Sequence, residues 1–321
     1  MSILNKVARK YRKALVTGGA GFIGSHICEK LVESAIQVIC IDDYSAGKKE
    51  NHAHLDKADN FKAVECDITD IHRLSECFSG VDIVFHNAAA KKNVCLDSPR
   101  RDLEVNAMGA FNLLELSKTF GVKKFIQAST GSVYGKPPHC LLNEDHSLRP
   151  ISYYGTSKMA AESYVRLFNV HYGLDTTILR YFHVYGTRQE AGELGGVIAI
   201  FIRNMVNGEQ PVIFGDGTQM RSFTYIKDVV AANLLVAVDE RASGETYNCA
   251  SGISVTIQEL CAKVIEYFGK TGSVIPRYED WMIGDAKFFN VGNEKIKALG
   301  LNFDTDFFDR LLDLCNKEIN N

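Results

Sequence analysis

The sequence contains no C-x-x-C pair, no long apolar run and no marked excess of either charge. Its nine cysteines are scattered, which argues against a zinc site or a disulfide framework and indicates a reducing, cytoplasmic setting. No stretch is long and apolar enough to span a bilayer, and no signal-peptide core follows the basic residues at the start, which we expect to form a solvated arm. The net charge of −3 gives no reason to expect a nucleic acid as partner.

What the sequence does contain is a cluster of glycines where an apolar run meets an amphipathic segment. Residues 14–17 predict a strand and residues 22–31 a helix, and Gly18, Gly21 and Gly24 fit G-x-x-G-x-x-G at the junction. Glycines at such a turn allow the sharp bend, the approach of a pyrophosphate and the packing of helix on strand. The first helical N–H groups would then face the phosphates. This stretch therefore predicts dinucleotide binding.

Three later strand ends carry groups suited to a dinucleotide. The run 37–41 ends in Asp42, whose carboxylate would bind the adenosine ribose and repel the 2′-phosphate of NADP. Asp67 could accept a hydrogen bond from the adenine amino group, or cap a helix expected after Asp70. Small residues from Ala88 onward would let the cofactor lie against the backbone. The predicted cofactor is NAD.

Strand-like and helix-like segments alternate through the first half of the chain. The predicted strands are 14–17, 37–41, 61–65, 81–86, 124–128 and 176–181, and the predicted long helices are 102–120, with Leu103 in its apolar stripe, and 152–172. This alternation indicates an α/β fold with a Rossmann-type, doubly wound parallel sheet.

The regular alternation of strands and helices ends after about residue 186, where glycines are frequent and the predicted elements are shorter. We therefore expect an NAD-binding domain over residues 1–185 and a smaller α/β substrate domain mainly over 186–321. A helix-like run at 228–238 looks as if it returns to the sheet, so a segment near 222–250 is expected to belong to the first domain.

A general acid–base pair is the strongest chemical signal. Tyr154 and Lys158 lie four apart and so share one face of the predicted helix 152–172. An ammonium near a phenol stabilises the phenolate, and we expect it to lower the pKa of Tyr154 toward neutrality. Thr130, at the end of the fifth predicted strand, offers a hydroxyl that could share the substrate proton. This machinery suits hydride transfer with a nicotinamide cofactor.

These motifs, together with Arg180-Tyr-Phe-His-Val-Tyr-Gly186 and the run from Gly215 to Val229, resemble one family across nearly the whole chain. It is the extended short-chain dehydrogenase/reductase family of nucleotide-sugar epimerases and dehydratases. The resemblance implies that Tyr154 is the base, that Lys158 holds the nicotinamide ribose, and that Thr130 is the hydroxyl partner. It further implies NAD-binding roles for Gly18, Gly21, Phe22, Ile23, Gly24, Asp42, Asp43, Ser45, Asp67, Ile68, Ala88, Ala89, Asn106, Tyr154, Lys158 and Tyr181, and substrate-binding roles for Lys92, Ser132, His183, Arg221 and Arg277.

Departures from the family pattern limit which of the family's reactions this chain is expected to catalyse. Dehydratases of the family typically carry Asp-Glu after the catalytic threonine, whereas this chain has Gly131 and Ser132. His183 stands where the family commonly has asparagine near the substrate phosphates, and Lys92 is an unusual cation that would lie on the substrate side or in a solvated loop. Arg221 would grip the substrate diphosphate or be a surface arginine.

We predict an NAD-dependent nucleotide-diphosphate-sugar 4-epimerase that works through a transient 4-keto sugar. The alternatives are a 4,6-dehydratase or C4 dehydrogenase of the same family and, remotely, a non-catalytic dinucleotide sensor. The expected partner is the nucleotide-sugar substrate, with no metal, nucleic acid or membrane, in a cytoplasmic homodimer.

Overall fold

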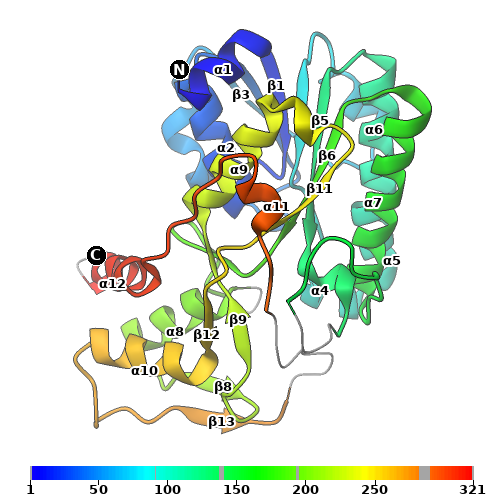
Figure 1. The fold of residues 1–321 in the computed structure, drawn as a ribbon. Coiled ribbons are helices and arrows are strands. Elements are labelled where there is room, and N and C mark those ends of the chain that lie inside the picture. Colours follow the sequence, from blue (N-terminus) through cyan, green and yellow to red (C-terminus); the bar gives the residue numbers. More distant parts are fainter. Residues whose placement is uncertain (1, 91, 137–140, 193–194, 282–289, 320–321) are drawn as a thin grey trace.

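The structure is a computed structural model that describes residues 2–90, 92–136, 141–192, 195–281 and 290–319, without the side chains of 92–94. It has a larger part built on one sheet and a smaller part below it in the view of Figure 1. The chain passes from the larger to the smaller part and back, so neighbouring elements in space are not always neighbours in sequence.

A seven-stranded parallel sheet forms the centre of the larger part, with strand order β11-β6-β5-β4-β1-β2-β3. The strands are β1 (Lys13–Thr17), β2 (Gln37–Asp42), β3 (Phe61–Glu65), β4 (Ile83–His86), β5 (Lys124–Thr130), β6 (Thr176–Tyr181) and β11 (Thr246–Cys249). Because the order reverses beside β1, the carboxyl ends of β1 and β4 open a crevice of the kind in which doubly wound sheets bind ligands. The predicted fold class is confirmed.

Helices cover both faces of this sheet. On one face lie α1 (Ile3–Lys10), α2 (Phe22–Glu33) and α9 (Ile226–Val238), and on the other α3 (Ile71–Ser75), α6 (Gly109–Thr119) and α7 (Tyr153–Tyr172). Two separate apolar cores result, because alternate residues of each strand point to opposite faces. In β1, Val16 packs toward α2 and Leu15 toward α6.

The beginning of the chain is not the solvated arm that we expected. Residues 3–10 form α1, Val7 and Tyr11 are buried, and Tyr11 Oη donates to the carbonyl of Ala237 at 2.5 Å. The basic residues of this segment suggested a solvated arm. The helix exposes its lysine and arginine side chains on one face, but its other face packs on α9.

The predicted helix 102–120 is divided. α5 (Pro99–Asp102) is followed by a π-helical segment, Leu103–Met108, and only then by α6. The wider π turn changes which residues face inward, so Leu103, placed in the apolar stripe by the sequence, is 59% exposed. Such turns are frequent at functional sites, and this one lies beside the cofactor cavity described below.

The smaller part has its own apolar core, which includes Phe201, Ile213, Leu260 and Leu311. Its elements, with the short links that join it to the sheet, are β7 (Val184–Tyr185), α8 (Val197–Val206), β8 (Val212–Phe214), β9 (Met220–Ser222), β10 (Thr224–Tyr225), β12 (Ser254–Thr256), α10 (Ile257–Tyr267), β13 (Arg277–Glu279) and α12 (Phe307–Ile319). The short helix α11 (Glu294–Lys297) packs instead against β11 of the large sheet. The remaining elements are α4 (Lys92–Asp97) and 3₁₀ turns at Lys49–Asn51, Ala53–Leu55, Gly131–Tyr134 and Glu240–Ala242. The strands pair two by two, as β7 with β10, β8 with β13 and β9 with β12.

Candidate active site

The glycine turn between β1 and α2 tolerates no side chain at two of its positions. Gly18 has a φ of +66°, and a Cβ there would lie 2.7 Å from the backbone nitrogen of Ala88. A Cβ on Gly24 would lie 2.1 Å from the carbonyl oxygen of Gly18. No side chain caps α2 at Gly21, so its first N–H groups are left for a ligand. This geometry fits a dinucleotide pyrophosphate.

A cavity of about 660 Å³ opens in front of this turn, within the usual range for small-molecule sites. Twelve residues of the predicted cofactor set line it: Gly18, Gly21, Phe22, Ile23, Gly24, Asp42, Asp43, Ser45, Asp67, Ile68, Ala88 and Ala89. Asn106, Tyr154, Lys158 and Tyr181, from the same set, do not line it. Sequence reasoning missed Arg101, Arg188 and Gln189, which do, because they belong to no motif.

Asp42 is held in place by the backbone. Its carboxylate accepts N–H groups from Ala20 and Tyr44, each at 2.9 Å, and it is buried at the end of β2. Burial raises the pKa of Asp42, and the two N–H groups oppose that rise. The carboxylate thus ties the glycine turn to β2 as well as facing the cavity.

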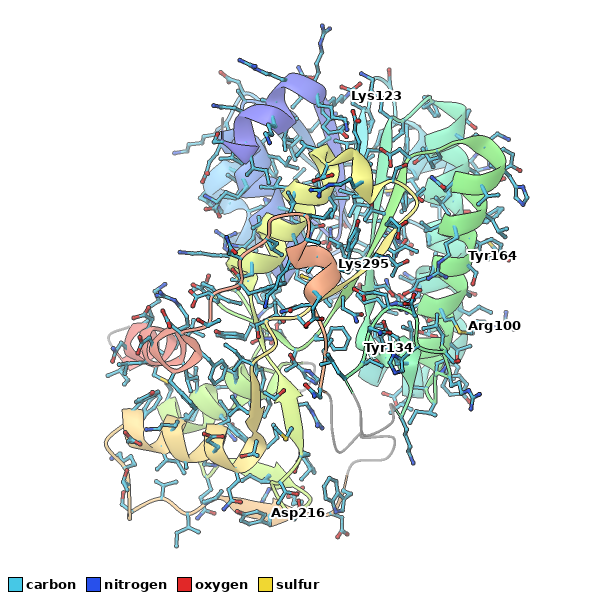
Figure 2. The ribbon with its side chains drawn as sticks, in the orientation of Figure 1. Arg100, Lys123, Tyr134, Tyr164, Asp216 and Lys295 are labelled. Carbon is cyan, nitrogen blue, oxygen red and sulfur yellow. The ribbon has the colours of Figure 1, made fainter. Side chains whose placement is uncertain are left out.

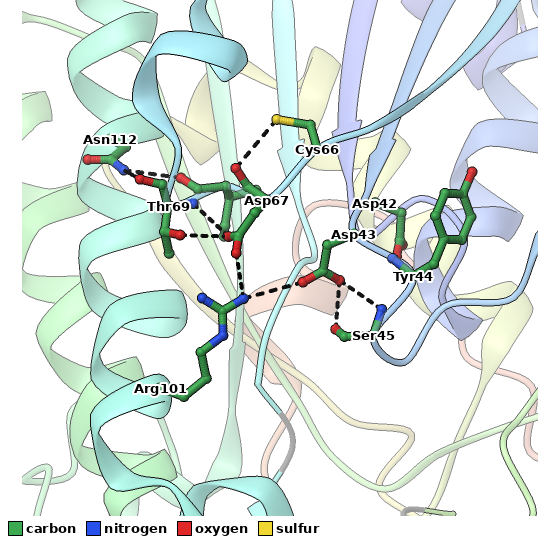
Figure 3. A network of polar contacts seen from close by, with 10 residues as sticks. Asp42, Asp43, Tyr44, Ser45, Cys66, Asp67, Thr69, Arg101 and Asn112 are labelled. Carbon is green, nitrogen blue, oxygen red and sulfur yellow. Dashed lines mark hydrogen bonds and ion pairs between the residues drawn. The ribbon is translucent and has the colours of Figure 1, made fainter.

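A guanidinium joins two other carboxylates at this end of the cavity (Figure 3). Arg101 Nη2 lies 2.7 Å from Asp67 Oδ2 and 3.4 Å from Asp43 Oδ2. Asp67 also accepts from the backbone and hydroxyl of Thr69. The cap of α3 is supplied by Asp70, which accepts from the backbone N–H of its first turn, so that alternative for Asp67 does not apply.

The predicted catalytic groups come together at the carboxyl end of β5. Ser152 caps α7, accepting from the backbone N–H of Gly155 at 3.1 Å, and so fixes the turn that carries Tyr154. The side chains of Tyr154 and Thr130 share a hydrogen bond. Lys158, one turn further, is 2% exposed.

The pKa of Tyr154 is not lowered in the protein alone, contrary to the sequence-based expectation. Burial, with smaller contributions from Cys95 and Asp102, raises it to about 12, and the hydrogen bond with Thr130 opposes the rise. Burial also lowers the pKa of Lys158 to about 8. Desolvation is the largest cause of both shifts, so the lowered tyrosine pKa that the spacing suggested is not present in the protein alone.

A buried carboxylate, missed by the sequence reasoning, organises this region. Asp102 Oδ1 accepts hydrogen bonds from Cys95 Sγ at 2.7 Å, Asn106 Nδ2 at 2.7 Å and Ser157 Oγ at 3.0 Å. Asn106 also accepts from the N–H of Ala90 at 2.9 Å, so it supports the wall of the cavity from behind. Asp102 thereby connects that wall to the helix of the catalytic pair.

Several charged and titratable groups, on different elements, surround Lys158. Glu162 and Asp102 raise its pKa and so oppose the effect of burial. Cys95 acts in the same direction, and burial keeps the pKa of its own thiol high. On the sheet side, His86 is neutral because burial and the charge of Lys158 lower its pKa well below its ordinary value.

Glu162 is itself part of a buried ion pair that braces α7 against the sheet. Arg180 on β6 donates to both of its carboxylate oxygens, at 2.9 and 2.7 Å, and Ser129 on β5 donates to it at 2.6 Å. The third guanidinium nitrogen reaches the hydroxyl of Tyr134 at 2.6 Å, a residue that Figure 2 shows inside the molecule. Removing one partner of such a pair leaves a buried charge and costs several kcal/mol, on the order of 3–5.

The predicted substrate residues lie on separate elements of the structure. Arg221 is buried on β9 and donates to the carbonyl of Met220 at 2.9 Å, whereas Arg277 on β13 is 62% exposed and pairs with Glu279 at 2.8 Å. His183 is exposed before β7 with a φ of +34°.

Three other predicted positions complete the set. Ser132 is half-buried and its N–H donates to Thr130 Oγ1 at 3.1 Å, which places it beside the catalytic groups. Tyr181 is buried in the sheet core and accepts from Asn233 Nδ2 at 2.8 Å. Lys92 begins α4, and its side chain lies outside the described part of the chain.

The described residues lack two features that would point to another kind of protein. No helix there has the length and apolarity needed to cross a membrane. No group of three or more histidine, cysteine, aspartate or glutamate side chains there is arranged to hold a metal ion.

Comparison with known proteins agrees with this geometry. The model of the NAD-dependent epimerase/dehydratase family matches residues 14–250. A putative UDP-glucose 4-epimerase of Methanocaldococcus jannaschii is 36% identical over 96% of this chain and 98% of its own length. The structure of UDP-glucose 4-epimerase from Thermotoga maritima with UDP-glucose is 37% identical, has a TM-score of 0.89, and covers 96% of this chain and 99% of its own.

A third relative was solved with the cofactor. UDP-glucose 4-epimerase from Thermus thermophilus, in complex with NAD, is 31% identical with a TM-score of 0.85, over 95% of this chain and 99% of its own. The glycine turn, the cavity before it and the Tyr154–Lys158 pair on α7 are thus explained together: the chain belongs to the NAD-dependent epimerase/dehydratase family.

Proposed function

We propose that this enzyme is a 4-epimerase of UDP-sugars. The observation that carries the proposal is the group formed by Tyr154, Thr130 and Lys158, at the carboxyl end of β5, with no carboxylate at positions 131 and 132. The relatives named above are UDP-glucose 4-epimerases, which supports a UDP-sugar as substrate.

The chain's own residues divide the work of oxidation and reduction at C4. NAD, when bound, supplies the nicotinamide that accepts a hydride and returns it. Tyr154 takes the proton of the 4-hydroxyl and later gives one back, while Thr130 shares that proton through its hydrogen bond to Tyr154. Lys158 holds a positive charge at the base of the site and would bind the nicotinamide ribose.

The high pKa of Tyr154 makes a positive charge beside it necessary. With a pKa of about 12, the phenol is protonated at neutral pH in the protein alone. Proton transfer becomes favourable only when cationic groups stabilise the phenolate, and Lys158 is the nearest such residue along α7. The positive charge of bound NAD would add to that of Lys158 and help the phenolate to form.

Dehydration at C5 and C6 would need an acid and a base that position 131 cannot provide. A Cβ on Gly131 would lie 2.4 Å from the ring of Phe182, so the fold has no room for a carboxylate side chain there. Ser132 is a weak acid and a weak base near neutral pH. A 4,6-dehydratase or a C4 dehydrogenase remains the alternative reaction, and a non-catalytic sensor would have no use for the acid–base group.

Deuterium at C4 of UDP-glucose tests the reaction. We expect a product of unchanged mass, inverted at C4, with the deuterium retained and no net NADH. A product lighter by one water identifies a dehydratase, and stoichiometric NADH with a stable keto sugar identifies a dehydrogenase; either overturns the proposal. If NAD binds but no UDP-, GDP-, CDP- or dTDP-sugar is converted, the protein is a sensor.

We also propose that the protein is a homodimer in the cytoplasm. The outer face of α7 carries Tyr164, Leu167 and Val170, the last 75% exposed, and α6 runs beside it (Figure 2). A second copy of this face would cover these side chains. Val170→Glu should then shift the sedimentation from dimer to monomer. The described cysteines are free and buried, which suits a reducing compartment.

A further inference from the structure

Arg101 reaches from one wall of the cofactor cavity to the other. It stands on α5 and its side chain lines the cavity, while its partners Asp43 and Asp67 follow β2 and β3 on the opposite wall (Figure 3). The contacts are 2.7 Å to Asp67 Oδ2 and 3.4 Å to Asp43 Oδ2, both made by Nη2. All three side chains are about one third exposed, so water reaches this ion pair.

The two carboxylates are fixed from behind. Asp43 Oδ1 accepts from the N–H of Ser45 at 3.0 Å and from its hydroxyl at 2.6 Å. Asp67 Oδ1 accepts in the same way from Thr69, at 2.9 and 2.8 Å. Each carboxylate therefore keeps its Oδ2 turned toward Arg101, and neither needs to reorganise when the guanidinium leaves or returns.

The backbone beside Arg101 is fixed as well. The next residue is Asp102, which is buried and accepts three hydrogen bonds. A long side chain that faces two fixed acceptors needs only rotation about its own bonds to leave them, so the walls need not move.

We propose that Arg101 is an ionic latch across the adenosine end of the cavity, which slows the release of bound NAD without contacting the reacting atoms. The adenosine half can leave only when the guanidinium gives up both carboxylates. Because the pair is partly exposed, the effect should be moderate and should weaken with salt. The proposal rests on NAD binding and is independent of which reaction follows.

The rate of cofactor release tests the latch directly. The protein is loaded with NADH, and the loss of its fluorescence is followed after mixing with excess NAD. Arg101→Met removes the charge and keeps the length, and we expect release about tenfold faster, with association changed less than twofold. Arg101→Lys, which keeps the charge but not the fork, should lie between the two.

Arg100 supplies a matched control. It is the preceding residue on the same helix, it is exposed at the edge of the molecule, and it does not line the cavity (Figure 2). Arg100→Met should leave release unchanged. If it accelerates release as much as Arg101→Met does, the effect is general charge and the latch is refuted.

Salt provides a second, independent reading. Raising the ionic strength should speed release from the wild type and bring it toward Arg101→Met, whose own rate should hardly change. Equal release rates for the wild type and Arg101→Met, or a loss of affinity that comes from slower association, would overturn the proposal. Thermal unfolding without cofactor establishes that each variant is folded. Since no turnover is measured, failure of the proposed epimerisation would leave this result intact.

Discussion

The cofactor end and the substrate end of this molecule are built in different ways. At the cofactor end, main-chain N–H groups and short turns hold each functional side chain, as they do for Asp42. The predicted substrate residues come instead from separate two-stranded sheets, Arg221 on β9 and Arg277 on β13. The predicted cofactor residues are thus held locally by the backbone, whereas the predicted substrate residues lie on segments that are far apart in the chain.

The largest expected effect lies where the two ends meet, at Tyr154. Tyr154→Phe removes only the hydroxyl, so the fold and NAD binding should survive while kcat falls roughly 10²- to 10⁴-fold. Steady-state rates and NAD titration measure the two quantities separately. Near-normal turnover would show that another group is the base, and the neighbouring Tyr153 would be the first candidate. Tyr154 would then not be the residue that links the cofactor end to the substrate end.

The next effect sharpens the contrast within the substrate end. Arg221 is buried and Arg277 exposed, so Arg221→Ala should raise KM for a UDP-sugar roughly 10- to 100-fold, as expected for a lost hydrogen bond to a charged group. Arg277→Ala should change KM by less than about twofold, because exposed ion pairs contribute little. Equal effects of the two substitutions would mean that the exposed strand β13 takes part in binding.

The cofactor end is tested by the carboxylate of Asp42. Asp42→Ala should weaken NAD binding about tenfold and reduce the preference for NAD over NADP, because it removes both the ribose acceptor and the group that ties down the glycine turn. Asp59→Ala, which removes an exposed carboxylate at the opposite, amino end of β3, is the control for net charge. Equal affinity of the wild type for NAD and NADP would contradict the role of Asp42.

The smallest effect concerns the charges behind Lys158. Its pKa is lowered to about 8, so the ammonium is lost, and activity with it, as the pH rises through about 8. Asp102 favours the ammonium; Asp102→Asn should therefore lower that pKa further and move the alkaline loss of kcat about one pH unit toward acid.

The surface carboxylate of Asp97 provides the control for this titration, since Asp97→Asn should leave the pH profile in place. A profile for Asp102→Asn that is lower at every pH but not displaced would reduce Asp102 to a purely structural role.

Most of the fold could be predicted because strands and helices leave a local pattern. The runs 61–65 and 176–181 coincide with β3 and β6. The helix at 102–120 was predicted without its π-helical segment, since periodicity alone does not reveal a widened turn. The packing of α1 on α9 was also missed, because it depends on residues more than two hundred positions away.

The functional site likewise has residues that the sequence could predict and residues that only the structure reveals. The glycine turn and the Tyr154–Lys158 spacing are motifs, and the sequence was enough to find them. Arg101 and Asp102 belong to no motif. The importance of Asp102 comes from burial and from partners such as Ser157, 55 positions away, and that of Arg101 from its pairing with Asp43 and Asp67. Nor could spacing reveal that burial dominates the pKa of Tyr154, because a pKa depends on how much water the fold excludes.

The place of β11 at the edge of the main sheet bears on how the chain is made. β6 is buried along its whole length between β5 and β11, yet β11 comes after α8, β8 and β9 of the smaller part. During synthesis the sheet therefore stays incomplete until residue 249 has left the ribosome, and until then β6 presents an open hydrogen-bonding edge. The large sheet therefore cannot be completed before α8, β8 and β9 of the smaller part have been synthesised. A nascent chain that stalls between β6 and β11 can associate, through the open edge of β6, with other chains made from the same messenger RNA.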